Sequence, residues 1–236
     1  MLSKRSSEQV LTDIQLIAVP FAGGSLNSYS QMKQIDGVKV INYELPGRGK
    51  RYEDSEYTME RVKKEIIKQI DFTKPYILFG HSMGAFIAYE TCALIEKLDL
   101  NRPYKVILSA QIPPHCVDTQ SYDREMNHAS VVAYLRSMGG TPEEVLDSIE
   151  LIDYYGKILK NDLTLLRKYL HNGWSPKIKS SIEIWNGIQD SMIPFSKVMK
   201  WKDVTLSECH IKSFEGGHFF INDLLSNPSR FKKELV

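Results

Sequence analysis

The sequence has few cysteines and no cysteine pair with the spacing of a metal or redox site. Its 236 residues include Cys92, Cys116 and Cys209 and no CxxC motif. An odd number of widely spaced cysteines argues against both a disulfide framework and a zinc site. We therefore interpret all three as reduced thiols, with Cys92 buried in a helical segment.

Long apolar runs and an excess of one charge are also absent. Nowhere do 18 apolar residues follow one another, and the first 13 residues lack the apolar core of a signal peptide. The net charge is +1, from 30 basic and 29 acidic residues. Bulk charge therefore indicates neither a nucleic acid nor a membrane surface as partner. We expect a cytoplasmic monomer that binds no metal and no cofactor.

The sequence shows no internal repeat, low-complexity tract or long linker, so we expect a single domain over residues 1–236. Short apolar runs alternate with helical patterns, which predicts an α/β fold with a mostly parallel sheet and helices on both faces. The predicted helices cover 58–70 and 85–98. The predicted strands are 15–21, 39–45, 75–79, 105–110, 181–187 and 209–214.

One segment, about 115–176, interrupts this alternation with helical patterns alone. Helical stretches are predicted over 128–140, 141–162 and 163–174, and a Thr-Pro pair at 141–142 marks the start of the second. An insertion between two strands would form a cap or lid above the strand ends, or a plain helical subdomain.

A run of basic residues in the first predicted helix allows two interpretations. Arg61, Lys63, Lys64 and Lys68 could bind an anion. Because apolar residues line the opposite side of the same helix, we favour a solvated outer face.

The motif G-x-S-x-G occurs at Gly80, Ser82 and Gly84, after an apolar strand and before an amphipathic helix. In this context the motif predicts a nucleophile elbow, a sharp turn that exposes the serine oxygen at the carboxyl edge of a sheet. Glycines are needed around the serine because the turn brings neighbouring backbone into contact. The alternative is a structural glycine-rich turn without chemistry.

A serine nucleophile requires a base and an orienting carboxylate, which follow it in the order acid, then histidine. His218 comes directly after the last predicted strand, and Asp190 lies in the loop after the strand before it. His81 flanks the serine and is expected to pack or to form a hydrogen bond. The other histidines, His115, His128, His171 and His210, fall in the insertion or inside a strand. Competing acids are Asp118, Asp203 and Glu215.

Two backbone N–H groups must stabilise the oxyanion of an acyl-transfer reaction. One is predicted at Met83, after the nucleophile. The other is predicted at Ala22, or at Phe21, in the loop after the first strand, where Gly23 and Gly24 allow close approach. These residues predict acyl transfer to water and leave open whether the acyl group leaves from sulfur, oxygen or nitrogen.

Several segments together resemble the type II thioesterases that accompany nonribosomal peptide and polyketide synthases. They span nearly the whole chain: PFAGGS (20–25), ELPGRGKR (44–51), LFGHSMGA (78–85), LSAQIPP (108–114), YLRSMGGTPEEVL (134–146), LKNDLTLLRKY (159–169), WNGIQDSMIP (185–194) and FEGGHFFI (214–221). One departure is the LRAD-like segment of the family, which here reads LKND and keeps Asp162 without the arginine.

The resemblance implies an α/β-hydrolase fold with a helical lid. It also implies a serine thioesterase that removes wrongly attached acyl groups from the phosphopantetheine arm of carrier domains. The alternatives are an esterase or lipase of free esters and a binding module without activity. Lid residues are candidates for an acyl pocket or for ordinary core: Met138, Tyr154, Tyr155, Leu159 and Leu166. Arg48, Lys50 and Arg51 could contact an acidic carrier domain or form a solvated loop.

Overall fold

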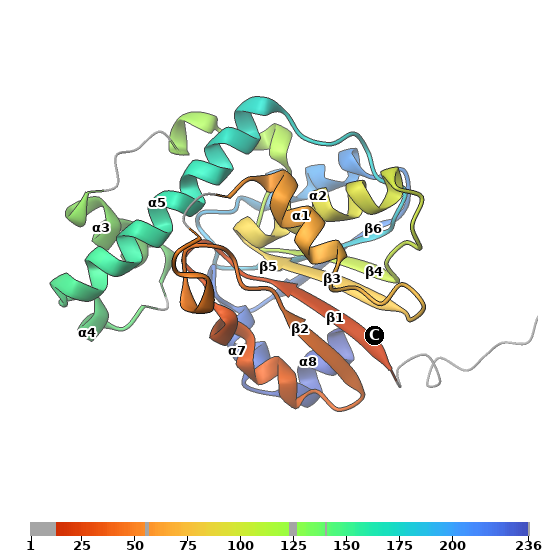
Figure 1. Ribbon diagram of the computed structural model, residues 1–236, viewed down its shortest axis with the longest axis horizontal. Coiled ribbons are helices and arrows are strands. Elements are labelled where there is room, and N and C mark those ends of the chain that lie inside the picture. The colour runs from red at the N-terminus through yellow and green to blue at the C-terminus, as the bar shows by residue number, and fades with distance from the viewer. Residues whose placement is uncertain (1–12, 55–56, 123–126, 140, 236) are drawn as a thin grey trace, which may run out of the picture.

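Six parallel strands form one twisted sheet at the centre of the computed structural model, which describes residues 13–54, 57–122, 127–139 and 141–235 (Figure 1). The strand order is β2-β1-β3-β4-β5-β6, and neighbouring strands pair in parallel throughout the described sheet. The strands are β1 (Ile14–Val19), β2 (Val38–Asn42), β3 (Tyr76–His81), β4 (Lys105–Ser109), β5 (Ile182–Gly187) and β6 (Cys209–Phe214). All six predicted strands are confirmed, and so is the α/β fold class.

Helices cover both faces of the sheet, and each face has its own apolar core. Alternate residues of β1 point to opposite sides, so Ile17 belongs to one core and Leu16 to the other. One face carries α1 (Met59–Ile67) and α2 (Met83–Lys97). The opposite face carries η2 (Leu26–Gln34), α7 (Ile221–Leu225) and α8 (Pro228–Leu235) (Figure 1). Burial on both faces explains why the strands read as nearly continuous apolar runs.

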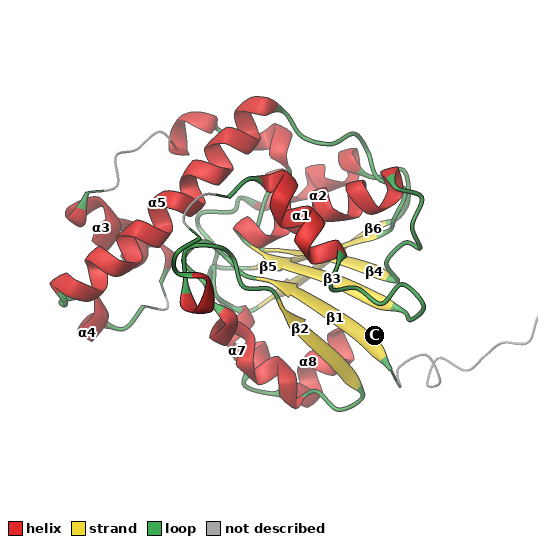
Figure 2. Cartoon of the chain, in the orientation of Figure 1, coloured by secondary structure: helices red, strands yellow, loops and turns green. Residues whose placement is uncertain are grey.

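The predicted interruption of the alternation is confirmed in the described part of 115–176, which contains helices and no strand (Figure 2). Residues 123–126 and 140 of the predicted segment, like the two ends of the predicted domain 1–236, lie outside the described residues. The helices extend beyond the carboxyl ends of the strands. They are η4 (Pro114–Cys116), η5 (Thr119–Tyr122), α3 (His128–Met138), α4 (Glu143–Leu146) and α5 (Ile149–Asn172).

The structure differs from the predicted division of these helices in three places. The chain breaks after Leu146, because the Ser148 hydroxyl accepts a hydrogen bond from the N–H of Leu151 and starts a new helix there. Pro142, and not Thr141, is the N-cap of the short helix before the break. No break occurs at Asp162, so α5 continues for 24 residues.

Short elements complete the fold: η3 (Gly49–Arg51) lies in the loop after β2, and α6 (Phe195–Val198) and η6 (Met199–Val204) connect β5 to β6. Within the described residues, no helix combines the length and the apolar character needed to cross a bilayer.

Helix α1 differs from its prediction at one lysine. Val62 and Ile66 are fully buried, as the apolar spacing predicts. Lys63 is buried as well, and its ammonium lies between the carboxylates of Glu60 and Glu90, at 3.1 and 3.6 Å. The interpretation of a uniformly solvated basic face is therefore wrong at this position.

Candidate active site

Ser82 stands at the junction of β3 and α2 in a backbone conformation that is rare for a residue with a side chain. Its φ is 53° and its ψ is −118°. The neighbouring backbone holds this conformation, because the Ser82 N–H donates to the carbonyl of Ser109 at 2.8 Å and the N–H of Ala85 donates back to Ser82 at 2.9 Å. A positive φ outside glycine costs free energy and persists only where the surrounding structure enforces it. The sharp turn predicted from the motif is present.

The two glycines of the motif are required by close backbone contacts. A Cβ atom on Gly80 would lie 2.0 Å from the carbonyl oxygen of Gly84, and one on Gly84 would lie 2.3 Å from the carbonyl oxygen of Val19. Real Cβ atoms do not approach backbone oxygens this closely. The elbow is therefore packed against β1 with no space for a side chain at either position.

His218 and Asp190 are brought together by the loops that follow β6 and β5. The Nδ1 of His218 lies 2.8 Å from Oδ2 of Asp190, and the side chains are 3% and 1% exposed. The other oxygen of Asp190 accepts the N–H of Met192 at 3.0 Å. Gly187 lets these loops approach, since a Cβ there would lie 2.4 Å from the carbonyl of Gly217. The two residues that the sequence paired therefore lie in hydrogen-bond contact, and their catalytic roles stay a prediction.

The competing acids have other partners. Glu215 accepts a hydrogen bond from Gln189 at 2.8 Å, and Asp203 lies 3.9 Å from His115. Asp118 accepts the N–H of Gln120 at 3.1 Å.

Ser82 and His218 line the same cavity, which has a volume of about 490 Å³. The Nε2 of His218 is buried, and no hydrogen-bond partner for it is present among the described residues. With Nδ1 turned to Asp190, this second nitrogen is the one available to exchange a proton with the serine hydroxyl.

His81 lies behind the pair as a buried, neutral neighbour. Its Nδ1 is 2.9 Å from the hydroxyl of Ser109, and its ring stacks on Phe219 with the centroids 5.6 Å apart. Burial lowers the pKa of His81 well below its ordinary value, and the nearby His218 lowers it further. The prediction that His81 packs and takes part in a hydrogen bond is confirmed.

The two predicted oxyanion donors lie just beyond the carboxyl ends of β1 and β3, Ala22 in a loop and Met83 at the start of a helix. Met83 is the first residue of α2, where backbone N–H groups have no partner within the helix. Ala22 and Phe21 both line a second cavity of about 640 Å³ beside the first. The next N–H along this loop, that of Gly23, donates to a carboxylate of Asp162 at 2.7 Å.

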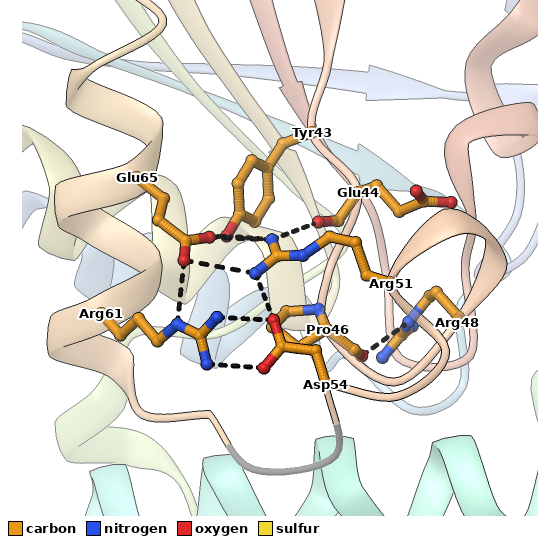
Figure 3. Close-up of polar contacts among 8 residues, drawn as sticks. All are labelled: Tyr43, Glu44, Pro46, Arg48, Arg51, Asp54, Arg61 and Glu65. Atoms are coloured by element: carbon orange, nitrogen blue, oxygen red, sulfur yellow. Dashed lines mark hydrogen bonds and ion pairs between the residues drawn. The ribbon is translucent and has the colours of Figure 1, made fainter.

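Neither alternative for this loop, a docking surface or a solvated loop, fits Arg48. Arg48 is buried, with 1% of its side chain exposed, and pairs with Asp162. Arg51 donates to Glu65, Asp54 and Tyr43 in a network that ties the loop after β2 to helix α1 (Figure 3). Lys50 is exposed and lines the larger cavity.

Asp162 is a buried residue of the insertion whose partners the sequence did not reveal. It lies on α5 with no exposure, and burial raises its pKa above the ordinary value although the charge of Arg48 and the N–H of Gly23 act in the opposite direction. Tyr57 donates a hydrogen bond to the same carboxylate. The only sequence signal was the Asp162 retained in the LKND segment of the family pattern.

The insertion supplies much of the lining of both cavities. Tyr134 and Met138, on α3, line both of them, and Tyr154, Tyr155 and Leu159 line the larger. Leu166 lines neither and is part of the core, 2% exposed. Across the described residues, no three His, Cys, Asp or Glu side chains gather as a metal site requires.

A parallel sheet with a sharp strand-to-helix turn at Ser82 and a His–Asp pair at the same edge defines the class of the protein, the α/β-hydrolases. The family model of the thioesterase domain matches residues 14–231. The chain belongs to this family.

Two relatives illustrate the match in sequence. The medium-chain S-acyl fatty acid synthase thioesterase of Homo sapiens is 29% identical over 219 residues, which cover 89% of this chain and 81% of the relative. Thioesterase PikA5 of Streptomyces venezuelae is 26% identical over 218 residues, with 89% and 76% covered.

Two solved structures are similar in fold. The RedJ thioesterase of the prodiginine pathway of Streptomyces coelicolor has a TM-score of 0.78 and 25% identity, covering 92% of this chain and 85% of its own. The type II thioesterase BorB of the borrelidin cluster has a TM-score of 0.80 and 25% identity, with 95% and 91% covered. The predicted resemblance is confirmed, and the protein is a hydrolase that acts on thioesters.

Proposed function

We propose that Ser82, His218 and Asp190 form a catalytic triad that removes acyl groups from the phosphopantetheine arm of carrier domains in a nonribosomal peptide or polyketide synthase. The observation that supports this most directly is the buried Asp190–His218 pair, whose histidine lines the same cavity as Ser82. A role in such a pathway is supported by the names of relatives, among them BorB and the gramicidin S biosynthesis protein GrsT. The family favours thioesters over the free esters of the alternative hypothesis.

In the proposed mechanism, Nε2 of His218 takes the hydroxyl proton of Ser82 while the serine oxygen bonds to the acyl carbon. The N–H groups of Ala22 and Met83 stabilise the oxyanion. The carbon–sulfur bond then breaks, and His218 returns the proton to the pantetheine thiolate. A water molecule attacks the acyl-serine in the same way, which releases the carboxylic acid and restores Ser82. Asp190 keeps the imidazole in the required tautomer.

The proposal includes action as a cytoplasmic monomer on a carrier domain, without a metal or cofactor of its own. Three free cysteines support a reducing compartment: Cys92, Cys116 and Cys209. The pantetheine arm arrives with the substrate. The larger cavity, lined by Tyr154, Tyr155 and Leu159, offers an apolar surface to the acyl chain.

The test compares Ser82→Ala with Ser137→Ala, a serine that lines the same cavity and donates only to the carbonyl of Tyr134. With an acylated carrier domain as substrate and intact-mass detection, we expect Ser82→Ala to lower kcat by more than about 10³-fold. Ser137→Ala should stay within about threefold. A fluorophosphonate probe should label Ser82 in the unmodified protein.

Two outcomes would contradict the proposal. If Ser82→Ala retained its activity, another group would be the nucleophile. If the unmodified protein hydrolysed simple esters as fast as the acylated carrier, the esterase alternative would be favoured instead.

A further inference from the structure

A buried arginine lies in the loop after β2, where a surface residue was expected. A guanidinium cannot lose its charge at neutral pH, so burying Arg48 is costly unless every donor finds a partner. Its Nη2 pairs with Asp162, its Nη1 donates to the carbonyl of Gly24 at 2.7 Å, and its Nε donates to Pro46 at 3.4 Å (Figure 3 shows the last contact). The side chain thus points inward, away from any docking surface.

The carboxylate of Asp162 accepts hydrogen bonds from three residues in two separate loops. One oxygen accepts the N–H of Gly23 at 2.7 Å, and the other accepts from Arg48 and from the hydroxyl of Tyr57. Asp162 itself belongs to α5 of the insertion. A single carboxylate therefore joins the loop after β1, the loop after β2 and the insertion.

These contacts fix the loop that carries the predicted oxyanion donor. The N–H of Gly23 is held by Asp162, and the carbonyl of the next residue, Gly24, is held by Arg48. Gly23 has a φ of +82°, a turn that places it under the side chain of Leu159, also on α5. Ala22 precedes this anchored turn directly.

We propose that Arg48 and Asp162 are positioning residues that hold the loop after β1 so that the N–H of Ala22, and not that of Gly23, faces the oxyanion. The inference rests on the proposed function of Ser82. The N–H of Gly23 is already used by Asp162, whereas the N–H of Ala22 has no hydrogen-bond acceptor among the described residues. Because Asp162 lies on α5, the insertion also sets the geometry of the oxyanion site.

The test uses Asp162→Asn and Arg48→Lys, with Asp54→Asn as the matched control. Asp54 lies in the same loop as Arg48, but it pairs with Arg51 and Arg61 (Figure 3), and among the described residues it forms no ion pair with the loop after β1. We expect Asp162→Asn and Arg48→Lys, the two inner variants, each to lower kcat by about 10²-fold, which is the effect of losing one oxyanion donor. Their KM should stay within about twofold of the value for the unmodified protein. The control should retain its kcat.

A second readout separates positioning from loss of structure. A boronic acid that forms a tetrahedral adduct with Ser82 should bind the inner variants more weakly by the same factor as kcat falls. Substrate affinity should change little. Equal losses in kcat and substrate affinity, or unchanged kcat in folded variants, would overturn the inference.

Tyr57→Phe provides a milder variant should the charge changes prevent folding. It removes one donor to Asp162 and leaves the ion pair, so we expect a loss in kcat of about fivefold, again with KM unchanged. Unchanged kcat would count against the inference. Failure of the proposed function itself would appear differently, as retained activity in Ser82→Ala.

Discussion

At the scale of single residues, the elbow depends on the absence of two side chains. The positive φ of Ser82 is maintained because Gly84 packs against β1 and Gly80 packs against the first turn of α2. A methyl group at either position would have to displace backbone, which is the most rigid part of the structure. The two glycines of the motif therefore meet a steric requirement of the turn, and the turn would need them even if the serine had no catalytic role.

Gly80→Ala should destabilise the protein by at least about 3 kcal/mol, because its Cβ would lie 2.0 Å from a carbonyl oxygen that cannot move away. Gly217→Ala is the matched control, since its Cβ would meet its nearest atom, the oxygen of Gln189, at 3.9 Å. For Gly217→Ala we expect the free energy of unfolding to change by less than about 1 kcal/mol. The free energy of unfolding in urea measures both, and equal effects would contradict the steric argument.

At the scale of elements, helix α2 supports both the active site and the return of the chain from the insertion. Its N-terminus carries Met83 beneath the site. Further along, Glu90 accepts hydrogen bonds from the hydroxyl of Tyr169, at 3.0 Å, and from the N–H and hydroxyl of Ser175, at 2.8 and 2.6 Å. One carboxylate thus fixes the end of α5 and the segment that follows it.

Glu90→Ala should lower the free energy of unfolding by about 3 kcal/mol, because several buried donors, including the ammonium of Lys63, would lose their acceptor. Ser175→Ala removes a single hydroxyl bond, so we expect about 1 kcal/mol. Urea denaturation followed by circular dichroism distinguishes the two. If Glu90→Ala were no more destabilising than Ser175→Ala, the contacts of Glu90 with the end of α5 would contribute little to stability.

At the scale of the whole molecule, the net charge is close to zero, but individual carboxylates are closely paired with basic residues. Burial raises the pKa of Glu183, but hydrogen bonds from Trp185 and Lys212 and the charge of Lys105 lower it more, to a value below the ordinary 4.5. Because its folded pKa is lowered, Glu183 stabilises the fold above pH 4.5. This contribution is lost as the pH falls through the folded pKa.

His81 adds a separate dependence at higher pH. Its folded pKa is also lowered, so the unfolded chain binds a proton more readily once the pH falls below 6.5. We expect the free energy of unfolding to fall below pH 6.5 by up to about 1.4 kcal/mol per pH unit from this group. Urea denaturation between pH 8 and 3.5 should show this phase and a second one below pH 4.5.

Two variants test which residue causes each phase of the pH dependence. His81→Gln should flatten the dependence between pH 6.5 and 5, while Glu183→Gln should reduce the loss below pH 4.5 and leave the upper phase intact. An unaltered upper phase in His81→Gln would show that another group causes it.

The sequence by itself determined the sheet, the elbow and the Asp190–His218 pair. Apolar periodicity reports burial directly, and in a parallel sheet the carboxyl ends of all strands meet at one edge, so residues just after the strands must gather there. The break before Ser148 was missed, because a local cap competed with a continuous helical pattern.

Only the tertiary structure determined that Arg48, Lys63 and Asp162 are buried and paired. A charged residue in a loop or on a helix has the same local pattern whether it faces water or a buried partner. Its partner can lie 114 positions away, as Asp162 does from Arg48. Long-range pairing of this kind leaves no periodicity in the sequence, because it depends on which surfaces the completed fold brings together.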